Sequence, residues 1–218
     1  KRASYYGQPG HEMHPNLIYC WIMSITNTDN PLTLFQEWFD RAAETEINEP
    51  TAVTLSTATK AGRPSARMVL LKHYDERGFV FYTNLESRKG LELTENPFAA
   101  LLFHWKSLKR QIRIEGRCEL IDDDEADAYF ASRDRGSQIG AWASDQSRTM
   151  PGRFELEKKI AVFTAKFGIG AVPRPLHWSG YRLLPDNLEF WDDGKFRLHE
   201  RIVYTKTENL WVTDRLFP

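Results

Sequence analysis

Four basic side chains in residues 67–90 could together bind an anion. They are Arg67, Lys72, Arg88 and Lys89. The last two directly follow Ser87, a favourable N-cap residue, and should therefore lie in the first turn of a helix. Cations are unfavourable at the positive end of a helix macrodipole, but a phosphate bound there would offset their charge. We therefore expect an anion site in this segment, with an exposed basic turn as the alternative.

A second candidate site is the stretch RLHER at residues 197–201. On a strand, alternate residues share a face, so Arg197, His199 and Arg201 should project together. Two guanidinium groups beside an imidazole disfavour its protonation and create a surface suited to anions. Trp191 precedes a short Asp-Gly turn and adds an aromatic plane that suits a flat heteroaromatic ligand. The alternative is a solvent-exposed strand face.

A third set of polar side chains follows an acidic helix start. Tyr129 and Arg133 are spaced i,i+4 on one helix face, and Ser137 comes just past the expected helix end. A phenol, a guanidinium and a hydroxyl can hold a phosphate monoester through charge-assisted hydrogen bonds, although such a pair is often an ordinary surface contact. Polar groups that could contact the edge of a heterocycle are present at Gln111, Gln146 and Ser147.

The elements that must position these residues are mostly short strands with tight connections. Hydrophobic period and turn residues predict strands at residues 51–59, 66–73, 79–83, 98–105, 110–120, 178–184, 188–191, 197–204 and 210–214. Helices are predicted at residues 31–44 and 122–133 and from residues 150–151 onward. Sequential strands with short loops favour an antiparallel meander or barrel over a parallel sheet. We therefore expect a single α+β domain.

Composition excludes several classes of function. The 218 residues carry 29 Lys plus Arg against 30 Asp plus Glu, so nothing favours nucleic acid or an anionic membrane as a partner. The two cysteines and six histidines show no metal-type spacing, so we expect no metal site and a reducing, cytoplasmic location. The apolar run at residues 17–25 is far shorter than the ~20 residues of a membrane span, which favours a buried strand or a partner-facing segment.

Several longer stretches are more specific than any of these sets alone. They are RMVLLK, FYTNLESRKG, NPFAALLFHW, RQIRIEG, YFASR, GSQIGAWASDQS, WSGYRL, EFW, RLHERIVY and the terminal DRLFP. The combination of SRKG, SQIGAW and RLHER in this order is especially specific. On these stretches, which run from about residue 30 to residue 218, the chain resembles the pyridoxine/pyridoxamine 5'-phosphate oxidase family of flavin enzymes.

The resemblance implies an α+β fold, an antiparallel six-stranded split β-barrel of Greek-key type with flanking helices. It also implies a homodimer with the cofactor FMN at the subunit interface. Residues 31–218 would form the FMN-binding oxidase domain, and residues 1–30 an N-terminal segment that could act as a substrate lid. This segment departs from the family pattern, because the gap from Tyr5 to Pro31 is longer and contains the apolar run 17–25.

The resemblance also assigns site residues. The FMN-binding residues would be Arg67, Met68, Val69, Leu70, Leu71, Lys72, Tyr82, Thr83, Arg88, Lys89, Gln111, Gln146, Ser147, Trp191 and Arg201. The substrate-binding residues would be Lys72, Tyr129, Arg133, Ser137, Arg197, Leu198 and His199, with Arg2 and Tyr5 closing over the substrate. Arg197 and His199 would be the catalytic residues that cover the reacting pyridine ring. Alternation on the strand 66–73 places Arg67 and Lys72 on opposite faces, which would form a wall between a flavin phosphate and a substrate phosphate.

The implied reaction is an oxidation. Pyridoxamine 5'-phosphate or pyridoxine 5'-phosphate would become pyridoxal 5'-phosphate, with O2 as the acceptor, hydrogen peroxide as a product, and ammonia released from the amine. Two other functions remain open: another FMN-dependent enzyme on the same barrel, such as a reductase, and a non-catalytic protein that carries flavin or a vitamin B6 phosphate. The RLHER stretch and the set of Tyr129, Arg133 and Ser137 argue against a different flavin enzyme, because a generic flavin site needs neither.

Overall fold

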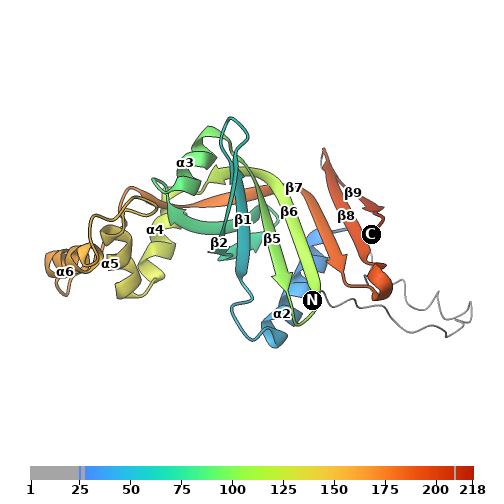
Figure 1. The fold of residues 1–218 in the computed structure, drawn as a ribbon, viewed down its shortest axis with the longest axis horizontal. Helices are drawn as coiled ribbons and strands as arrows, with labels where there is room; N and C mark the ends of the chain where they lie inside the picture. Colours follow the sequence, from blue (N-terminus) through green and yellow to red (C-terminus); the bar gives the residue numbers. More distant parts are fainter. Residues whose placement is uncertain (1–24, 26–27, 209) are drawn as a thin grey trace, which may run out of the picture.

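A computed structural model describes residue 25, residues 28–208 and residues 210–218. Within this part of the chain, nine strands form one sheet that is flanked by five α-helices (Figure 1). The strands are β1 (Ala52–Ala58), β2 (Pro64–Leu70), β3 (His73–Asp75), β4 (Gly78–Asn84), β5 (Phe98–Trp105), β6 (Arg110–Leu120), β7 (Trp178–Asp192), β8 (Glu200–Thr207) and β9 (Leu210–Arg215). The helices are α2 (Pro31–Thr45), α3 (Arg88–Glu95), α4 (Asp123–Ser132), α5 (Arg135–Ala143) and α6 (Glu155–Phe167), with a 3-10 turn η2 (Lys195–Arg197).

The sheet is antiparallel throughout. Its strands follow the order β2-β1-β5-β6-β7-β4-β3, and the hairpin of β8 and β9 pairs with β7. At one end of this order lies β2, and at the other lies β3, a strand of three residues that pairs with β4. The predicted α+β class and antiparallel sheet are therefore confirmed.

Helix α2 begins where the Asn-Pro pair predicts. The Asn30 side chain accepts a hydrogen bond from the Leu32 backbone N–H at 2.9 Å. Phe35, on the apolar face of the helix, packs edge-on against Phe79 and Phe103 at ring-centroid separations of 5.0 and 5.6 Å. Burying each such aromatic side chain contributes roughly 1.5–3 kcal/mol, which fixes the helix against the sheet.

Strand β7 is continuous, although the sequence predicts two strands at residues 178–184 and 188–191. Pro185 lacks a backbone N–H, and the pairing shifts register between Glu115 and Gly116 of β6 at this point. A Cβ atom on Gly116 would lie 2.0 Å from the Leu184 carbonyl oxygen, so only glycine permits this close approach. The bulge therefore lets one strand pass a proline that would otherwise end it.

Strand β8 begins at Glu200, three residues later than predicted. The residues before it form η2, in which Phe196 and Arg197 have φ angles of 59° and 65°. Such left-handed residues cannot continue an extended strand. The prediction that Arg197, His199 and Arg201 share one strand face is therefore wrong.

The helix predicted at residues 122–133 matches α4, and the helices α5 and α6 follow it. Helix α5 was not predicted; its N-cap Asp134 accepts a hydrogen bond from the Ser137 backbone N–H at 2.8 Å. Ser137 therefore lies in the first turn of a separate helix and not in a loop. Helix α6 begins at Glu155, later than the Met-Pro pair predicts.

The elements lie at two distinct ends of the molecule. Figure 1 shows α4, α5 and α6 at one end of the sheet and the β8–β9 hairpin at the other. The apolar run at residues 17–25 lies outside the described residues except for Ile25, which is buried in the core. None of the described helices has both the length and the apolar character needed to cross a bilayer.

Candidate functional site

A cavity of about 630 Å³ opens between the sheet and the helices α3, α4 and α5. Thirteen of the predicted site residues line it: Arg67, Met68, Val69, Leu70, Lys72, Tyr82, Thr83, Lys89, Tyr129, Arg133, Ser137, Gln146 and Ser147. We call this space the basic cavity. It brings together residues predicted for the flavin and residues predicted for the substrate.

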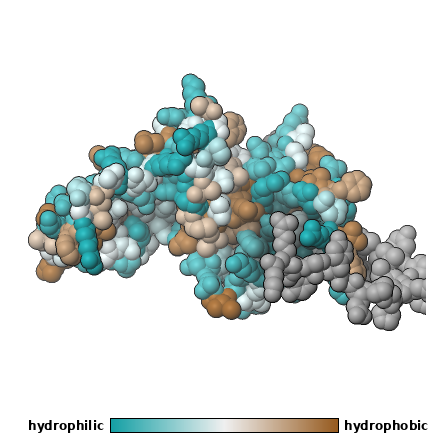
Figure 2. All heavy atoms as spheres, in the orientation of Figure 1, coloured by the Kyte–Doolittle hydropathy of each residue, from teal (hydrophilic) through white to brown (hydrophobic). Residues whose placement is uncertain are grey.

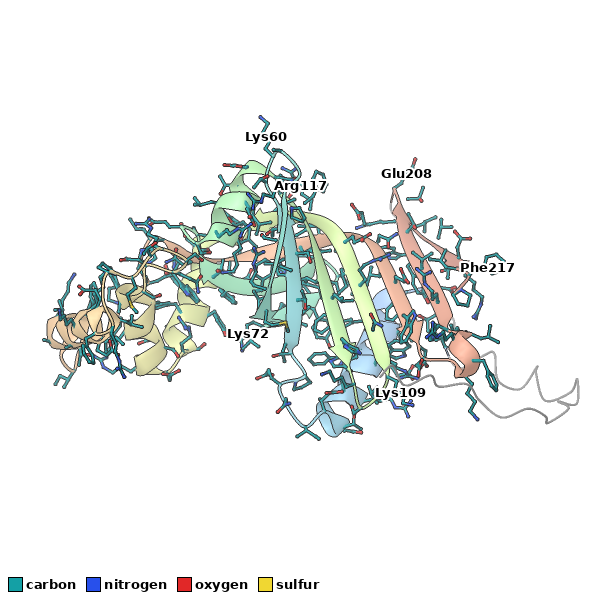
Figure 3. The ribbon with its side chains drawn as sticks, in the orientation of Figure 1. Lys60, Lys72, Lys109, Arg117, Glu208 and Phe217 are labelled. Carbon is teal, nitrogen blue, oxygen red and sulfur yellow. The ribbon has the colours of Figure 1, made fainter. Side chains whose placement is uncertain are left out.

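The two cations at the ends of the stretch RMVLLK line this same cavity, contrary to the predicted division between opposite faces. Strand β2 ends at Leu70, so strict alternation does not extend to Lys72. The Leu71 backbone N–H donates to Thr51, whereas the Lys72 backbone N–H donates to Val80 of β4. The backbone hydrogen bonds thus change partner between Leu71 and Lys72, and Lys72 lines the cavity. Figure 3 shows Lys72 on the side of the sheet nearer α4 and α5. Leu71 itself is buried in the hydrophobic core.

Lys89 is a buried cation without an acidic partner in the described part of the chain. Its Nζ donates to Thr83 Oγ1 and Gln146 Oε1, both at 3.1 Å, and to Ser87 Oγ at 3.3 Å. These acceptors are all neutral. Burial and the nearby charge of Arg67 lower the pKa of Lys89 to about 8. An anion in the basic cavity would relieve this cost.

Arg88 takes a different direction from Lys89. Its Nε donates to Glu92 Oε1 at 2.8 Å, an i,i+4 pair within α3, and most of its side chain is exposed. Arg88 does not line the basic cavity. The two cations in the first turn of α3 therefore have different environments: Arg88 pairs with a carboxylate, whereas Lys89 is buried beside the cavity.

Arg133 and Tyr129 bring aromatic and cationic groups to the opposite wall. The Arg133 guanidinium lies 4.7 Å from the ring centroid of Trp178, and its Nη1 is buried with no hydrogen-bond partner among the described residues. Burial lowers the pKa of this group, although Tyr129 and Asp134 act in the opposite direction. Tyr129 stacks on Tyr82 at 3.9 Å between ring centroids. A buried, unsatisfied guanidinium nitrogen is costly and suits a ligand with acceptor oxygens.

A second, smaller group of predicted residues lies elsewhere on the chain. Gln111, Trp191 and Arg201 line a cavity of about 300 Å³ together with Arg113 and Glu189. Gln111 and Trp191 face each other in the β6–β7 register. Arg201 Nε donates to Glu189 Oε1 at 2.7 Å. We call this space the β7–β8 cavity. The predicted flavin residues are thus divided between two cavities of one chain.

The predicted catalytic residues lie beside the β7–β8 cavity and not in the basic cavity. His199 packs on Trp191 at 4.5 Å between ring centroids, and its Nδ1 is 3.2 Å from Asp193 Oδ1. Arg197 and Leu198 are exposed in the turn between the two strands. The predicted pair Arg2 and Tyr5 lies outside the described residues, so its lid role stays a prediction.

Several residues that line the basic cavity were missed by the sequence reasoning. They are Asn84, Gly140, Ala141, Ser144 and Trp178. Three of these, with Ser137, are small residues spaced i, i+3, i+4 and i+7 along α5 and its C-cap Ser144. If a helix is assumed at these residues, this spacing predicts that the small side chains share one face of it. A Cβ atom on Gly140 would meet nothing within 4 Å, so the cavity extends to the helix backbone.

The sequence matches known family descriptions over both of these regions. Residues 39–167 match the description pyridoxamine 5'-phosphate oxidase, and residues 178–218 match the pyridoxine 5'-phosphate oxidase C-terminal dimerisation region. The chain belongs to the pyridoxine/pyridoxamine 5'-phosphate oxidase family. The dimerisation region spans β7 to β9 and therefore includes most of the β7–β8 cavity.

Relatives cover nearly the whole chain. A pyridoxine/pyridoxamine 5'-phosphate oxidase of Caulobacter vibrioides is 57% identical over 194 residues, which cover 89% of this chain and 87% of the relative. That of Rhodospirillum rubrum is 57% identical over 201 residues, which cover 90% of this chain and all of the relative. The prediction that the chain is an enzyme of this family is confirmed.

Solved structures share the fold. PhzG from Burkholderia lata, in complex with tetrahydrophenazine-1-carboxylic acid, has a TM-score of 0.82 at 37% identity, covering 88% of this chain and 94% of PhzG. A pyridoxamine 5'-phosphate oxidase-related, FMN-binding protein of Nostoc punctiforme has a TM-score of 0.68 at 16% identity, covering 85% and 96%. The predicted split-barrel fold is therefore confirmed.

Proposed function

We propose that this chain oxidises pyridoxamine 5'-phosphate or pyridoxine 5'-phosphate to pyridoxal 5'-phosphate, with FMN as cofactor and O2 as acceptor. Hydrogen peroxide would be a product, and the amine substrate would also release ammonia. The observation that carries the proposal is the lining of the basic cavity, which includes the four cations Arg67, Lys72, Lys89 and Arg133. Two of these cations, Lys89 and Arg133, are poorly compensated by the described residues.

The cavity residues fit a flavin phosphate on one side. Arg67 and Lys89 supply positive charge there, and Thr83, Gln146 and Ser147 add hydrogen-bonding groups. The charge of Lys89, which only neutral acceptors contact among the described residues, supports an anion beside it. When bound, FMN would accept the electrons of the oxidation and pass them to O2. Arg88, which pairs with Glu92 and does not line the cavity, would act on this anion only at longer range.

The other side of the cavity fits the substrate phosphate. Lys72, Tyr129, Arg133 and Ser137 all line it, and they combine charge with hydroxyl donors. Arg133 Nη1 would gain an acceptor that the described residues do not provide. The stacked rings of Tyr82 and Tyr129 hold this wall in a fixed position beside α4.

A second copy of the chain would complete the site. Arg197 and His199 lie beside the β7–β8 cavity, at the end of the molecule away from α4 and α5 (Figure 1). A single chain therefore does not bring them to the basic cavity, whereas a symmetric dimer can. Exposed apolar side chains, such as Met68 on β2 and Phe98 on β5, offer surface for such a contact. Figure 2 shows apolar residues on the surface in the region of β1 and β5.

The two groups would act on the reacting ring by position and charge. Arg197 of the partner copy would orient the pyridine ring and stabilise charge that develops during oxidation. His199 would orient the substrate oxygen or amine, held in turn by its contacts with Trp191 and Asp193. Neither group needs to be an obligatory base in this account.

The test is reduction of the bound flavin by substrate. The purified protein should be yellow, and pyridoxamine 5'-phosphate added without oxygen should bleach its visible absorbance; unphosphorylated pyridoxamine at the same concentration should act far more slowly. Admission of O2 should restore the colour and produce hydrogen peroxide. A protein that binds flavin but does not bleach would be a carrier or another flavin enzyme.

A second candidate substrate class follows from the likeness to PhzG. That protein was solved with tetrahydrophenazine-1-carboxylic acid, a fused-ring carboxylic acid without phosphate. The phosphate-sized set of Lys72, Arg133 and Ser137 favours a phosphorylated substrate for this chain. Anaerobic bleaching by the phenazine acid, with none by pyridoxamine 5'-phosphate, would reverse this preference.

A further inference from the structure

Glu92 is a buried carboxylate directly behind the wall of the basic cavity. Only 4% of the residue is exposed. Its Oε2 accepts hydrogen bonds from Thr57 Oγ1 and Ser65 Oγ, both at 2.5 Å, and from Arg67 Nη2 at 3.2 Å. Its Oε1 accepts from Arg88 Nε at 2.8 Å. One carboxylate of α3 therefore joins β1, β2 and two arginines.

The hydrogen bonds around Glu92 have a defined direction. A carboxylate only accepts, so the hydroxyls of Thr57 and Ser65 must donate their single hydrogens to it. Their oxygens are then free to accept from Arg67, whose Nη1 donates to Thr57 Oγ1 and whose Nη2 donates to Ser65 Oγ. Arg67 is thus held both by the carboxylate and by the two hydroxyls that the carboxylate orients.

We propose that Glu92 is a positioning residue, which holds the Arg67 guanidinium in place on the wall of the basic cavity to bind the phosphate of FMN. This inference rests on the proposed function, because it assumes that the anion beside Arg67 is the flavin phosphate. Glu92 does not line the cavity, so it acts through Arg67 and not by direct contact.

The charge of Glu92 makes this role testable against a simple electrostatic alternative. Burial raises the pKa of Glu92, but hydrogen bonds from Ser65, Thr57, Arg88 and Arg67 outweigh it and lower the pKa to about 2. The group is therefore an anion near a site for another anion. If its charge mattered more than its hydrogen bonds, removing that charge would strengthen phosphate binding. Positioning predicts the opposite result.

Glu92→Gln is the sharpest variant, because glutamine has the same shape but only one acceptor oxygen. If its amide nitrogen faces Thr57 and Ser65, it donates to them and turns their hydrogens toward Arg67. If the nitrogen faces Arg88, two donors oppose each other there. The first orientation disrupts the hydroxyls that hold Arg67, and in both orientations Arg67 loses the negative charge of its partner, which weakens the bond that holds it. We expect the dissociation constant of FMN to rise about tenfold, the size of one lost charge-assisted hydrogen bond, with that of riboflavin unchanged.

The measurement is titration of the flavin-stripped full chain with FMN and with riboflavin, which lacks the phosphate. Glu95→Gln is the matched control, since Glu95 is exposed on the same helix and should alter neither constant. A merely structural role for Glu92 would change both flavins equally. Unchanged or tighter FMN binding by Glu92→Gln overturns the proposal.

Two further results separate the possible failures. If Glu92→Gln does not fold, Thr57→Val removes one oriented hydroxyl while keeping the acid and the side-chain shape, and it should show the same phosphate-selective loss. An unaltered preference for FMN in that variant also overturns the proposal. A wild-type chain that binds FMN and riboflavin equally would instead contradict the phosphate site on which the proposed function depends.

Discussion

The basic cavity and the turn between β7 and β8 are built in opposite ways. In the cavity, two of the cations are held by polar groups of the same chain: Lys89 by three neutral oxygens and Arg67 by Glu92 and two hydroxyls. In the turn, Arg197 is exposed and lies at a φ of 65°. One region is organised within the chain before any ligand arrives, whereas the other presents its residues outward.

The turn is nevertheless a defined structure. Phe196 and Arg197 both adopt left-handed backbone angles, which cost roughly 1–3 kcal/mol each for residues other than glycine. A Cβ atom on Gly194 would lie 1.8 Å from the Leu198 carbonyl oxygen, so the turn closes only around glycine. His199 is fixed against Trp191 at the base of the turn. Strain of this kind, at an exposed position, fits a turn that reaches into a neighbouring copy.

The largest expected effect tests whether the two regions meet across a dimer. Arg133→Met removes a cation of the basic cavity, and Arg197→Met removes one from the turn. Each variant alone should lose roughly 10²-fold or more in kcat/KM for pyridoxamine 5'-phosphate, because each lacks one charge in every site. A heterodimer of the two variants should recover about half of the wild-type activity, since one of its two symmetric sites is intact.

The heterodimer can be isolated by co-expressing the two variants with different affinity tags. Flavin content is measured alongside activity, and Arg197→Met should retain its flavin. If the site were built within one chain, both sites of the heterodimer would be defective and no activity would return. Loss of flavin from Arg197→Met would contradict its assignment to the substrate.

The sequence was most informative where local signals agree with tertiary structure. The predicted bounds of β5 and β6 match those observed, because polar residues and the Asn96-Pro97 pair bound the two segments. The Asn-Pro start of α2 was also readable, since capping is a local property. Most of the residues that line the basic cavity were predicted from the resemblance to the oxidase family, and the sequence comparisons support that resemblance.

The errors lie where non-local contacts decide the backbone. Lys72 was assigned to the wrong face because the backbone hydrogen bonds change partner after β2. The Leu71 N–H bonds to Thr51, whereas the Lys72 N–H bonds to β4, and no local periodicity reveals this change. The left-handed angles at Phe196 and Arg197 carry no glycine signal, so the predicted strand began at Arg197 and not at Glu200. The partner of Arg88 was different: Glu92 stands at i+4 and could have been predicted from spacing alone.

A smaller expected effect is a pH dependence of FMN affinity that arises in the basic cavity, at Lys89. The pKa of Lys89 is about 8 in the unliganded cavity, and a bound phosphate would favour its charged form. Binding of FMN therefore requires proton uptake once the pH exceeds about 8, and the affinity should fall by up to about tenfold per pH unit above that value. This slope is measured by titrating the flavin-stripped protein with FMN at pH values from about 7 to about 9.5, a range that brackets the Lys89 pKa of about 8.

Two controls assign the slope to Lys89. Riboflavin carries no phosphate, so its affinity should stay level over the same range. Lys89→Arg keeps a charge that does not titrate there, and FMN binding to this variant should also stay level even if it is weaker overall. A slope that persists in Lys89→Arg would point to a different group in the cavity.

The smallest expected effect concerns the room that α5 leaves for a ligand. Gly140 lies within this helix and lines the basic cavity, and an added Cβ would meet no protein atom within 4 Å. Gly140→Ala should therefore raise the free energy of unfolding by up to about 1 kcal/mol through helix propensity. If substrate fills this space, the same change should raise KM for pyridoxamine 5'-phosphate a few-fold, and urea unfolding with steady-state kinetics measures both.

A matched substitution at Gly136 distinguishes an effect on helix stability from an effect on the cavity. Gly136 lies on the same helix but does not line the basic cavity, and its added Cβ would approach Asp134 Oδ1 at 3.2 Å. Gly136→Ala can alter stability through this cap, but KM should not change. A Gly140→Ala enzyme that is more stable and has an unchanged KM would show that the space beside α5 is not used by substrate. The binding wall would then consist of Lys72, Tyr129 and Arg133 without the helix face, and the cavity would be larger than its ligand requires.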